Sequence, residues 1–173
     1  MTITTKTKRL NKKDDSEIID QIVQFRKSAL KEMFNNDVDA NLKVRAKKVI
    51  DFEKIANNIR EQLDNNYFVL VYDRDQQLIG FGAFTIIQLF ADLFTNSNAM
   101  FMQGLYVIPE YRNKGIGTLI TNQRIEYAKN NNINKIFVES TSMSKNNNLK
   151  LGFINDNFAC KFNSPILDLL VKK

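Results

Sequence analysis

The chain has 173 residues, 43% of them apolar, which is enough for one domain with a sizeable core. It contains no histidine and one cysteine, Cys160, which excludes an internal disulfide, a histidine-rich metal site, and hydrolases that pair histidine with serine or cysteine. The net charge of +6 suits an anionic ligand, but the basic residues are scattered and form no sustained basic helix face, which argues against nucleic-acid binding.

The first part of the chain predicts two helices after a short strand over residues 1–9. Asp14 and Glu17, three residues apart, form a capping box that predicts the start of the first helix. An apolar stripe with helical spacing then continues to about residue 34. A second such stripe predicts a helix over residues 39–63.

Strands are predicted in the middle of the chain. Residues 67–72 are an apolar run, and residues 77–87 form the return strand after a polar turn. Residues 89–95 are expected to form a wide loop or a helical turn. Asparagine and serine at 96–98 predict a turn, and a further strand covers residues 99–108.

The stretch 104–127, GLYVIPEYRNKGIGTLITNQRIEY, predicts a strand, a glycine loop and a helix. Gly115 and Gly117 allow the backbone to approach a ligand closely. The helix start leaves unpaired N–H groups and the positive end of the dipole facing outward. This arrangement predicts a phosphate site, and Arg112 and Lys114 add positive charge beside it.

The rest of the chain completes the predicted sheet. A strand over residues 135–140 follows the helix and should run parallel to the strand before it, because a helix crosses over between them. A short helix over 145–151 ends at Gly152, a residue typical of helix C-termini. Residues 157–162 and 166–171 predict a closing antiparallel pair.

The pattern Arg112-x-x-Gly115-x-Gly117, directly after a strand, resembles the pyrophosphate-binding motif of the GCN5-related N-acetyltransferase (GNAT) superfamily. The preceding Leu-Tyr-Val-x-Pro-Glu-Tyr-Arg and the Leu-Gly-Phe at residues 151–153 are also similar to that family. The resemblance implies a single α/β (α+β) domain over residues 1–173, with a mixed sheet of about seven strands, about four helices, and two splayed parallel strands at an acetyl-CoA site.

The resemblance also implies a reaction and the residues that hold its cofactor. An acetyl group would pass from acetyl-CoA to a primary amine of a small molecule or a protein by direct attack on the thioester, with no metal. Loop N–H groups would cradle the pyrophosphate, and the splayed strand would pair with the pantetheine and polarise the thioester carbonyl. The cofactor-binding positions carried over are Leu105, Tyr106, Val107, Arg112, Asn113, Lys114, Gly115, Ile116, Gly117, Thr118, Thr141 and Asn148.

Three positions depart from the family's pattern. Asn148 stands where many members carry a tyrosine proton donor, Thr141 where many carry asparagine, and Phe101 where members often carry glutamate. Glu139 is the one carboxylate on the predicted parallel strand, and it is the candidate catalytic base. Tyr106 and Tyr111 are the alternatives, although a packing or rim role is the favoured interpretation of both.

The acceptor pocket is expected between residues 35–42 and 84–94, where phenylalanine and leucine favour an acceptor with an apolar part. Gly80 and Gly82 share one face of the predicted return strand, which leaves room either for a packed neighbour or for a substrate.

Two further expectations concern the whole chain. The absence of the usual tyrosine and glutamate keeps a second function open, a CoA-binding regulatory module of the same fold without turnover. The sequence has no secretory leader and no apolar run near about 20 residues, which predicts a cytoplasmic protein without a membrane anchor. The edge of the closing strands would suit a homodimer.

Overall fold

A computed structural model of the chain describes residues 2–13, 15–37, 60, 63–92, 95–138 and 142–153. In chain order the elements are β1 (Thr4–Arg9), α1 (Ser16–Asp37), the 3₁₀ turn η1 (Leu63–Asn65), β2 (Tyr67–Tyr72), β3 (Leu78–Asp92), β4 (Thr95–Val107), the 3₁₀ turn η2 (Pro109–Tyr111), α4 (Ile116–Asn130), β5 (Lys135–Val138) and α5 (Ser142–Lys150). The described residues thus form five strands and three α-helices. Most of the helix predicted over 39–63, and both closing strands, lie outside them.

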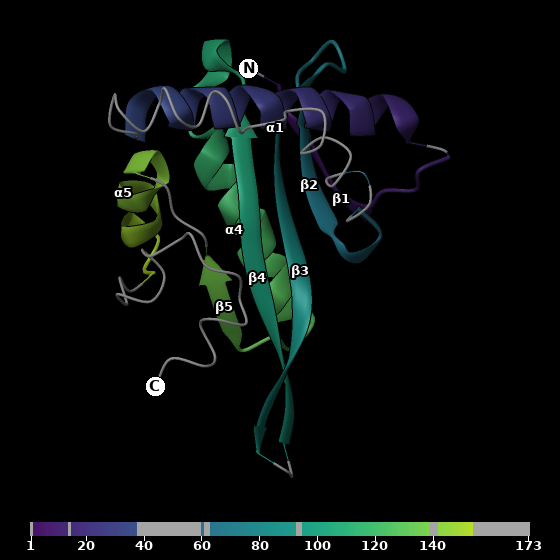
Figure 1. Cartoon of the computed structure of the whole chain (residues 1–173), viewed down its shortest axis with the longest axis vertical. Coiled ribbons are helices and arrows are strands. Elements are labelled where there is room, and N and C mark those ends of the chain that lie inside the picture. The colour runs from purple at the N-terminus through teal and green to yellow at the C-terminus, as the bar shows by residue number, and fades with distance from the viewer. Residues whose placement is uncertain are drawn as a thin grey trace.

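The five strands form one mixed sheet in the order β1-β2-β3-β4-β5 (Figure 1). The first four strands pair antiparallel, and β5 runs parallel to β4 after the crossover through α4, as predicted. The parallel pair is short, from Ala99 opposite Lys135 to Met102 opposite Val138. Beyond Met102, no pairing of β4 on this side is found among the described residues.

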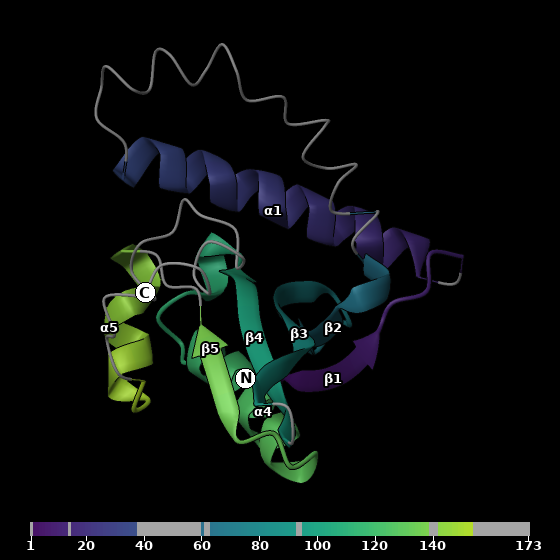
Figure 2. The ribbon, with the colours of Figure 1, turned by 60° about the horizontal axis from the view of Figure 1, so that its bottom comes forward.

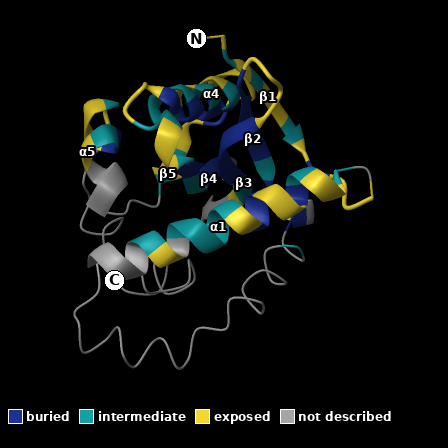
Figure 3. Ribbon diagram, turned by 90° about the horizontal axis from the view of Figure 1, so that it is seen from above, coloured by how far each residue is buried: buried dark blue, intermediate teal, exposed yellow. Residues whose placement is uncertain are grey.

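Helices cover both faces of the sheet, with α1 on one face and α4 on the other (Figure 3). Side chains alternate along β2, so that Phe68 and Leu70 join the core under α1, while Val69 and Val71 join the core under α4. Burying each such side chain contributes about 1.5–3 kcal/mol relative to leaving it exposed. The two cores therefore fix both helices relative to the carboxyl end of β4.

The glycines of β3 lie beneath α4. A Cβ atom at Gly82 would be 2.4 Å from Cγ2 of Ile120 and 3.2 Å from Cζ of Arg124. A Cβ atom at Gly80 would be 3.0 Å from the carbonyl oxygen of Tyr106. Of the two alternatives from the sequence, the structure supports packing, because these glycines let the helix approach the sheet closely.

The hairpin between β3 and β4 is longer than predicted (Figure 1). The loop or helical turn expected over 89–95 is wrong, because β3 continues to Asp92 and β4 begins at Thr95. The turn expected over 96–98 is wrong as well, since these residues pair with β3. The two segments satisfy each other's main-chain groups across the hairpin, and this outweighs the turn preference of asparagine and serine.

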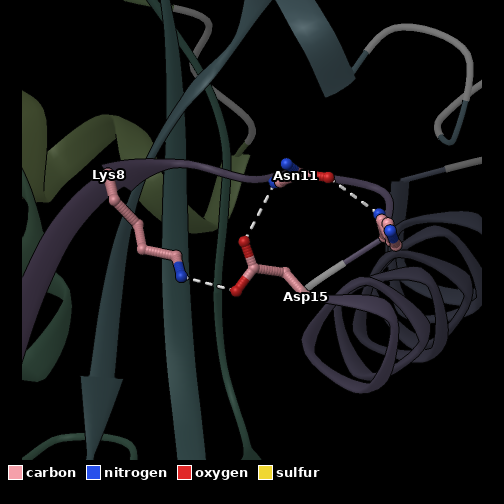
Figure 4. A network of polar contacts seen from close by, with 4 residues as sticks. Lys8, Asn11 and Asp15 are labelled. Atoms are coloured by element: carbon pink, nitrogen blue, oxygen red, sulfur yellow. Dashed lines mark hydrogen bonds and ion pairs between the residues drawn. The ribbon is translucent and has the colours of Figure 1, made fainter.

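The first helix begins at Ser16 rather than directly after Asp14, which lies outside the described residues. The N–H of Ile19 donates to the carbonyl oxygen of Asp15 at 2.9 Å, so Asp15 takes the N-cap position. Its carboxylate accepts hydrogen bonds from the N–H of Asn11, at 2.9 Å, and from Nζ of Lys8 (Figure 4). Asp14, the first residue of the expected capping box, is not described, and the contact observed at Asp15 joins α1 to the end of β1.

Candidate cofactor site

A cavity of about 360 Å³ lies at the carboxyl end of β4 and is lined by residues of α1, the start of α4 and α5. This volume falls in the range typical of ligand sites. Figure 2 shows α1 crossing above the end of β4, with α5 to one side. The lining residues are Ala29, Glu32, Leu105, Tyr106, Val107, Tyr111, Arg112, Asn113, Gly115, Ile116, Gly117, Thr118, Asn147 and Asn148. Every predicted cofactor-binding residue except Lys114 and Thr141 is among them, and Thr141 lies outside the described residues.

The glycine loop presents main-chain donors to this cavity. Gly115 adopts φ +80°, a conformation that favours glycine, and a Cβ atom there would meet nothing within 4 Å. The first helical hydrogen bond of α4 runs from the N–H of Leu119 to the Gly115 carbonyl, at 2.9 Å, and no side chain caps the helix. The N–H groups of Ile116, Gly117 and Thr118 therefore have no acceptor within the helix and can bind an anion.

A bulge shapes the open edge of β4. Gly104 has φ +54° and is the extra residue between Gln103 and Leu105, which pair with neighbouring residues of β3. The N–H of Ile108 donates to the Ile79 carbonyl of β3 at 3.0 Å. Because main-chain directions alternate along a strand, the N–H and C=O groups of Leu105 and Val107 face away from β3.

Tyr106, the third predicted edge residue, therefore turns its main chain toward β3, where it pairs with Phe81. Its side chain lies on the α1 face, with its ring 5.4 Å from that of Phe25. Of the three residues predicted to pair with a cofactor, only Leu105 and Val107 can offer their main chain at the open edge.

A carboxylate of α1 that the sequence analysis missed, Glu32, reaches this edge. Nη2 of Arg112 donates to Glu32 at 2.9 Å, and the Tyr106 hydroxyl donates to the same carboxylate at 3.1 Å. Nε of Arg112 donates to the Val107 carbonyl at 2.8 Å. The guanidinium also lies over the Tyr106 ring, 5.2 Å from its centroid. Arg112, the first residue of the loop motif, therefore contacts the Glu32 carboxylate, the Val107 carbonyl and the Tyr106 ring.

These contacts shift two pKa values. The hydrogen bond to Glu32 raises the pKa of Arg112 above its usual value, so the guanidinium stays charged at any physiological pH. Burial, and then the neighbouring Glu32 carboxylate, raise the pKa of the Tyr106 hydroxyl. Tyr106 therefore remains a protonated donor to Glu32, which does not suit the role of a base.

Tyr111 ties the loop to the sheet from the other side. Its hydroxyl donates to Oδ2 of Asp73, in the turn after β2, at 2.8 Å. This hydrogen bond raises the pKa of Tyr111, and the same contact holds the pKa of Asp73 below its usual value. Lys114 is exposed, and its Nζ donates to the Glu110 carbonyl at 2.9 Å. It lies beside the cavity rather than in its wall.

The last wall of the cavity is α5, which begins at Ser142, earlier than the predicted start at 145. Its Asn147 accepts a hydrogen bond from the Thr118 hydroxyl at 3.0 Å, so this predicted phosphate donor has a protein partner here. Asn148 lines the cavity and is only 5% exposed. The predicted helix end is confirmed, because α5 ends at Lys150 and Gly152, two residues further on, adopts φ +88°.

The described residues that line the cavity supply no unpaired carboxylate to act as the base. Glu139 lies outside the described residues. Phe101, at the position where relatives often carry glutamate, is buried. Among the described residues that line the cavity, Glu32 is the only carboxylate, and Arg112 neutralises it.

Other predicted features fall outside this cavity or outside the described residues. Phe84, expected at the acceptor pocket, is fully buried on the α4 face, where its ring stacks 5.2 Å from that of Tyr67. Residues 38–42, on the other side of the expected pocket, are not among those described. In the described part of the chain, no group of three metal-ligating side chains occurs and no helix is long and apolar enough to cross a membrane.

The family model described as the acetyltransferase (GNAT) family matches residues 30–153. No curated protein matches the chain. Several solved structures share its fold. A predicted acetyltransferase from Clostridium acetobutylicum, crystallised with acetyl-CoA, has a TM-score of 0.67 at 19% identity, with 96% of this chain and 98% of that chain covered.

Two further structures extend this comparison. A GCN5-related N-acetyltransferase from Ralstonia eutropha has a TM-score of 0.63 at 14% identity, covering 96% of this chain and 99% of that chain. A glucosamine-6-phosphate N-acetyltransferase from Arabidopsis thaliana has a TM-score of 0.53 at 14% identity, covering 94% of this chain and 98% of that chain. At these identities the likeness concerns the fold.

Proposed function

The chain belongs to the acetyltransferase (GNAT) family, and on that premise we propose that it transfers an acetyl group from acetyl-CoA to a primary amine. The acceptor is an amine of a small molecule or of a protein. The observation that carries the proposal is the uncapped start of α4, which points its free N–H groups into a cavity that also contains the open edge of β4.

The residues of this cavity fit the cofactor. N–H groups of Ile116, Gly117 and Thr118 would hold the pyrophosphate at the positive end of the α4 dipole. The main chain of Leu105 would pair with an amide of the pantetheine arm, because no described residue of β5 pairs with this part of the edge. Both contacts use main-chain groups fixed by the fold, so little rearrangement is needed when the cofactor binds.

Acetyl-CoA supplies the activated acyl group as a thioester. The neutral amine forms a bond to the carbonyl carbon, the carbon–sulfur bond breaks, and the amine loses a proton. We assign the proton acceptor to Glu139, the carboxylate that follows β5 in the sequence. Asn148 lines the cavity but cannot donate a proton at neutral pH, so sulfur leaves as thiolate, whose parent thiol has a modest pKa.

The alternative function is a CoA-binding module without turnover, because no described carboxylate other than the paired Glu32 lines the cavity. The experiment that separates the two measures release of free thiol from acetyl-CoA in the presence of a panel of amines, including amino sugars, polyamines, amino acids and lysine peptides. Amine-dependent thiol release supports the enzyme, whereas micromolar acetyl-CoA binding with no release above the background supports the module. Absence of acetyl-CoA binding contradicts both.

The remaining expectations follow from the same proposal. The enzyme would act in the cytoplasm as one domain over residues 1–173, without a metal. A homodimer through the closing strands remains a proposal that sedimentation can test.

A further inference from the structure

The side chain of Arg112 is engaged away from the start of α4, although it is the first residue of the loop motif. Its Nε donates to the Val107 carbonyl at 2.8 Å, and its Nη2 pairs with Glu32 at 2.9 Å. A guanidinium has a planar fork of donors, and both contacts use that fork in one fixed orientation.

We propose that Glu32 is a positioning residue of the cofactor site, which holds Arg112 against β4 so that phosphate binding is left to the main-chain N–H groups of α4. This inference rests on the proposed binding of acetyl-CoA. It deepens that function by assigning a role to a residue of α1, far from the motif in the sequence.

The geometry explains why the pair acts on the strand. Because Arg112 occupies the Val107 carbonyl, Val107 can offer only its N–H at the edge of β4, and Leu105 is the edge residue that can offer both its N–H and its carbonyl. The pair with Glu32 and the Tyr106 ring fixes the plane of the guanidinium that makes this contact. Without Glu32, the side chain would be free to rotate and the Val107 carbonyl would lose its partner.

The same contacts argue against Arg112 as a direct phosphate ligand. Both side chains are 29% exposed, so moving the guanidinium to a phosphate would remove the cation from the half-buried Glu32 carboxylate, whose charge the neutral Tyr106 hydroxyl does not balance. An unpaired charge in such a place is unfavourable. The phosphates can instead be bound by α4, whose N–H groups lie in the same cavity.

The test measures acetyl-CoA affinity of the whole chain by calorimetry, for the parent protein and for Glu32→Gln, Arg112→Lys, Arg112→Gln and the double variant Glu32→Gln/Arg112→Lys. Lysine keeps the positive charge but cannot contact Val107 and Glu32 as a fork. Asp15→Asn is the matched control, because it breaks the carboxylate contact at the other end of α1, away from the cavity. Thermal melting shows that each variant is folded.

We expect Glu32→Gln to weaken acetyl-CoA binding about fivefold to tenfold. The two Arg112 variants should weaken it more than Glu32→Gln does, and by the same factor as each other. In the Glu32→Gln background, Arg112→Lys should cost little more, since the two residues act as one unit. Asp15→Asn should leave the affinity unchanged.

Three outcomes would overturn the inference while leaving the proposed function standing. Tighter binding by Glu32→Gln would mean that the carboxylate competes with phosphate for Arg112. Full affinity in Arg112→Lys beside a loss in Arg112→Gln would mean that the charge binds phosphate directly. An equal loss of acetyl-CoA affinity in Asp15→Asn would mean that the affinity depends only on the position of α1 against the sheet. Failure of the parent protein to bind acetyl-CoA would instead remove the proposed function, and the inference with it.

Discussion

The two ends of α1 are fastened to the sheet by the same chemistry. At the amino end, Asp15 accepts hydrogen bonds from Lys8 and from the N–H of Asn11 (Figure 4). At the carboxyl end, Glu32 accepts hydrogen bonds from Arg112 and Tyr106. Each end therefore has one carboxylate, one cation and one neutral donor.

Their surroundings differ, and so does what they can do. The contacts of Asp15 join residues 7 and 4 positions apart, whereas those of Glu32 join residues 80 and 74 apart. Asp15 meets the end of β1, and only Glu32 lines the cavity. The comparison teaches that an ion pair acquires a functional role from the elements that it joins, rather than from its own geometry.

The strongest way to break the comparison is Gly117→Glu, which tests whether the carboxyl end of α1 lies at a cofactor site at all. A carboxylate at the first turn of α4 would occupy the N–H cradle and repel phosphate, so acetyl-CoA affinity should fall at least about 100-fold. Gly117→Ala is the control, because its Cβ would meet only Leu105 Cδ2, at 3.8 Å. Calorimetry that finds equal affinities in the two variants would contradict the site.

The middle of α1 offers a second test, where Arg26 rests on the bulge of β4. A Cβ atom at Gly104 would be 2.6 Å from the Arg26 guanidinium, in a backbone with φ +54°. We expect Gly104→Ala to lower the free energy of unfolding by about 1 kcal/mol, mainly through the backbone, because the guanidinium is the far end of a flexible side chain and can move aside. Gly152→Ala has the same backbone penalty without a neighbour within 4 Å, and should lower it by about 1 kcal/mol. A clearly larger loss in Gly104→Ala than in Gly152→Ala, measured by urea unfolding, would show that Arg26 is held in place over the bulge.

A third test concerns the pairing itself, since Arg124 of α4 is a buried cation for which no carboxylate partner is found among the described residues. It donates to the Ala83 carbonyl and to Thr121 Oγ1, each at 3.2 Å, and its Nε has no partner. Burial lowers the pKa of Arg124 to about 10, so it is still charged at neutral pH. Replacing this charge by a side chain of similar length, in Arg124→Met, should raise the free energy of unfolding by about 1 kcal/mol. A loss of stability in urea unfolding would mean that the two hydrogen bonds outweigh the burial of the charge.

The smallest effect is expected at the amino end of α1. Burial acts to raise the pKa of Asp15, but the hydrogen bonds from Lys8 and Asn11 outweigh it, so the pKa lies below its ordinary value of 3.8. A lowered pKa in the folded state means that this stabilisation is present above pH 3.8 and is lost as the pH falls through the folded-state pKa. Asp15→Asn should therefore cost less than about 1 kcal/mol at pH 7, and the two proteins should converge in acid. A constant difference from pH 7 to pH 2 would contradict this assignment.

The sequence predicts the strand, the glycine loop and the helix start well because their signals are local. Gly115, Gly117 and the helix that follows lie in one short stretch, where strand, loop and helix start each have their own residue preferences. The parallel strand and the glycine after α5 follow from equally local rules. The contacts of Asp15 are local as well, because they join residues only 7 and 4 positions apart in the sequence.

Features that depend on distant partners could not be predicted in this way. Glu32 carries no signal in its own helix, because its role arises only when α1 crosses the end of β4. The long hairpin was missed because its strands satisfy each other across the turn, whatever their individual preferences. The glycines of β3 were ambiguous until Ile120 of α4 was found above them.

The open edge of β4 also bears on how the molecule avoids unwanted self-association. Unpaired main-chain groups at a sheet edge are a template onto which a strand of another molecule can add. Here the bulge at Gly104 breaks the register on one side of Leu105, and Arg112 occupies the Val107 carbonyl on the other. A foreign strand needs several consecutive pairs, and this edge offers too few in register. On the proposed function, this edge is long enough to pair with the pantetheine arm of acetyl-CoA and too short to start the growth of a sheet.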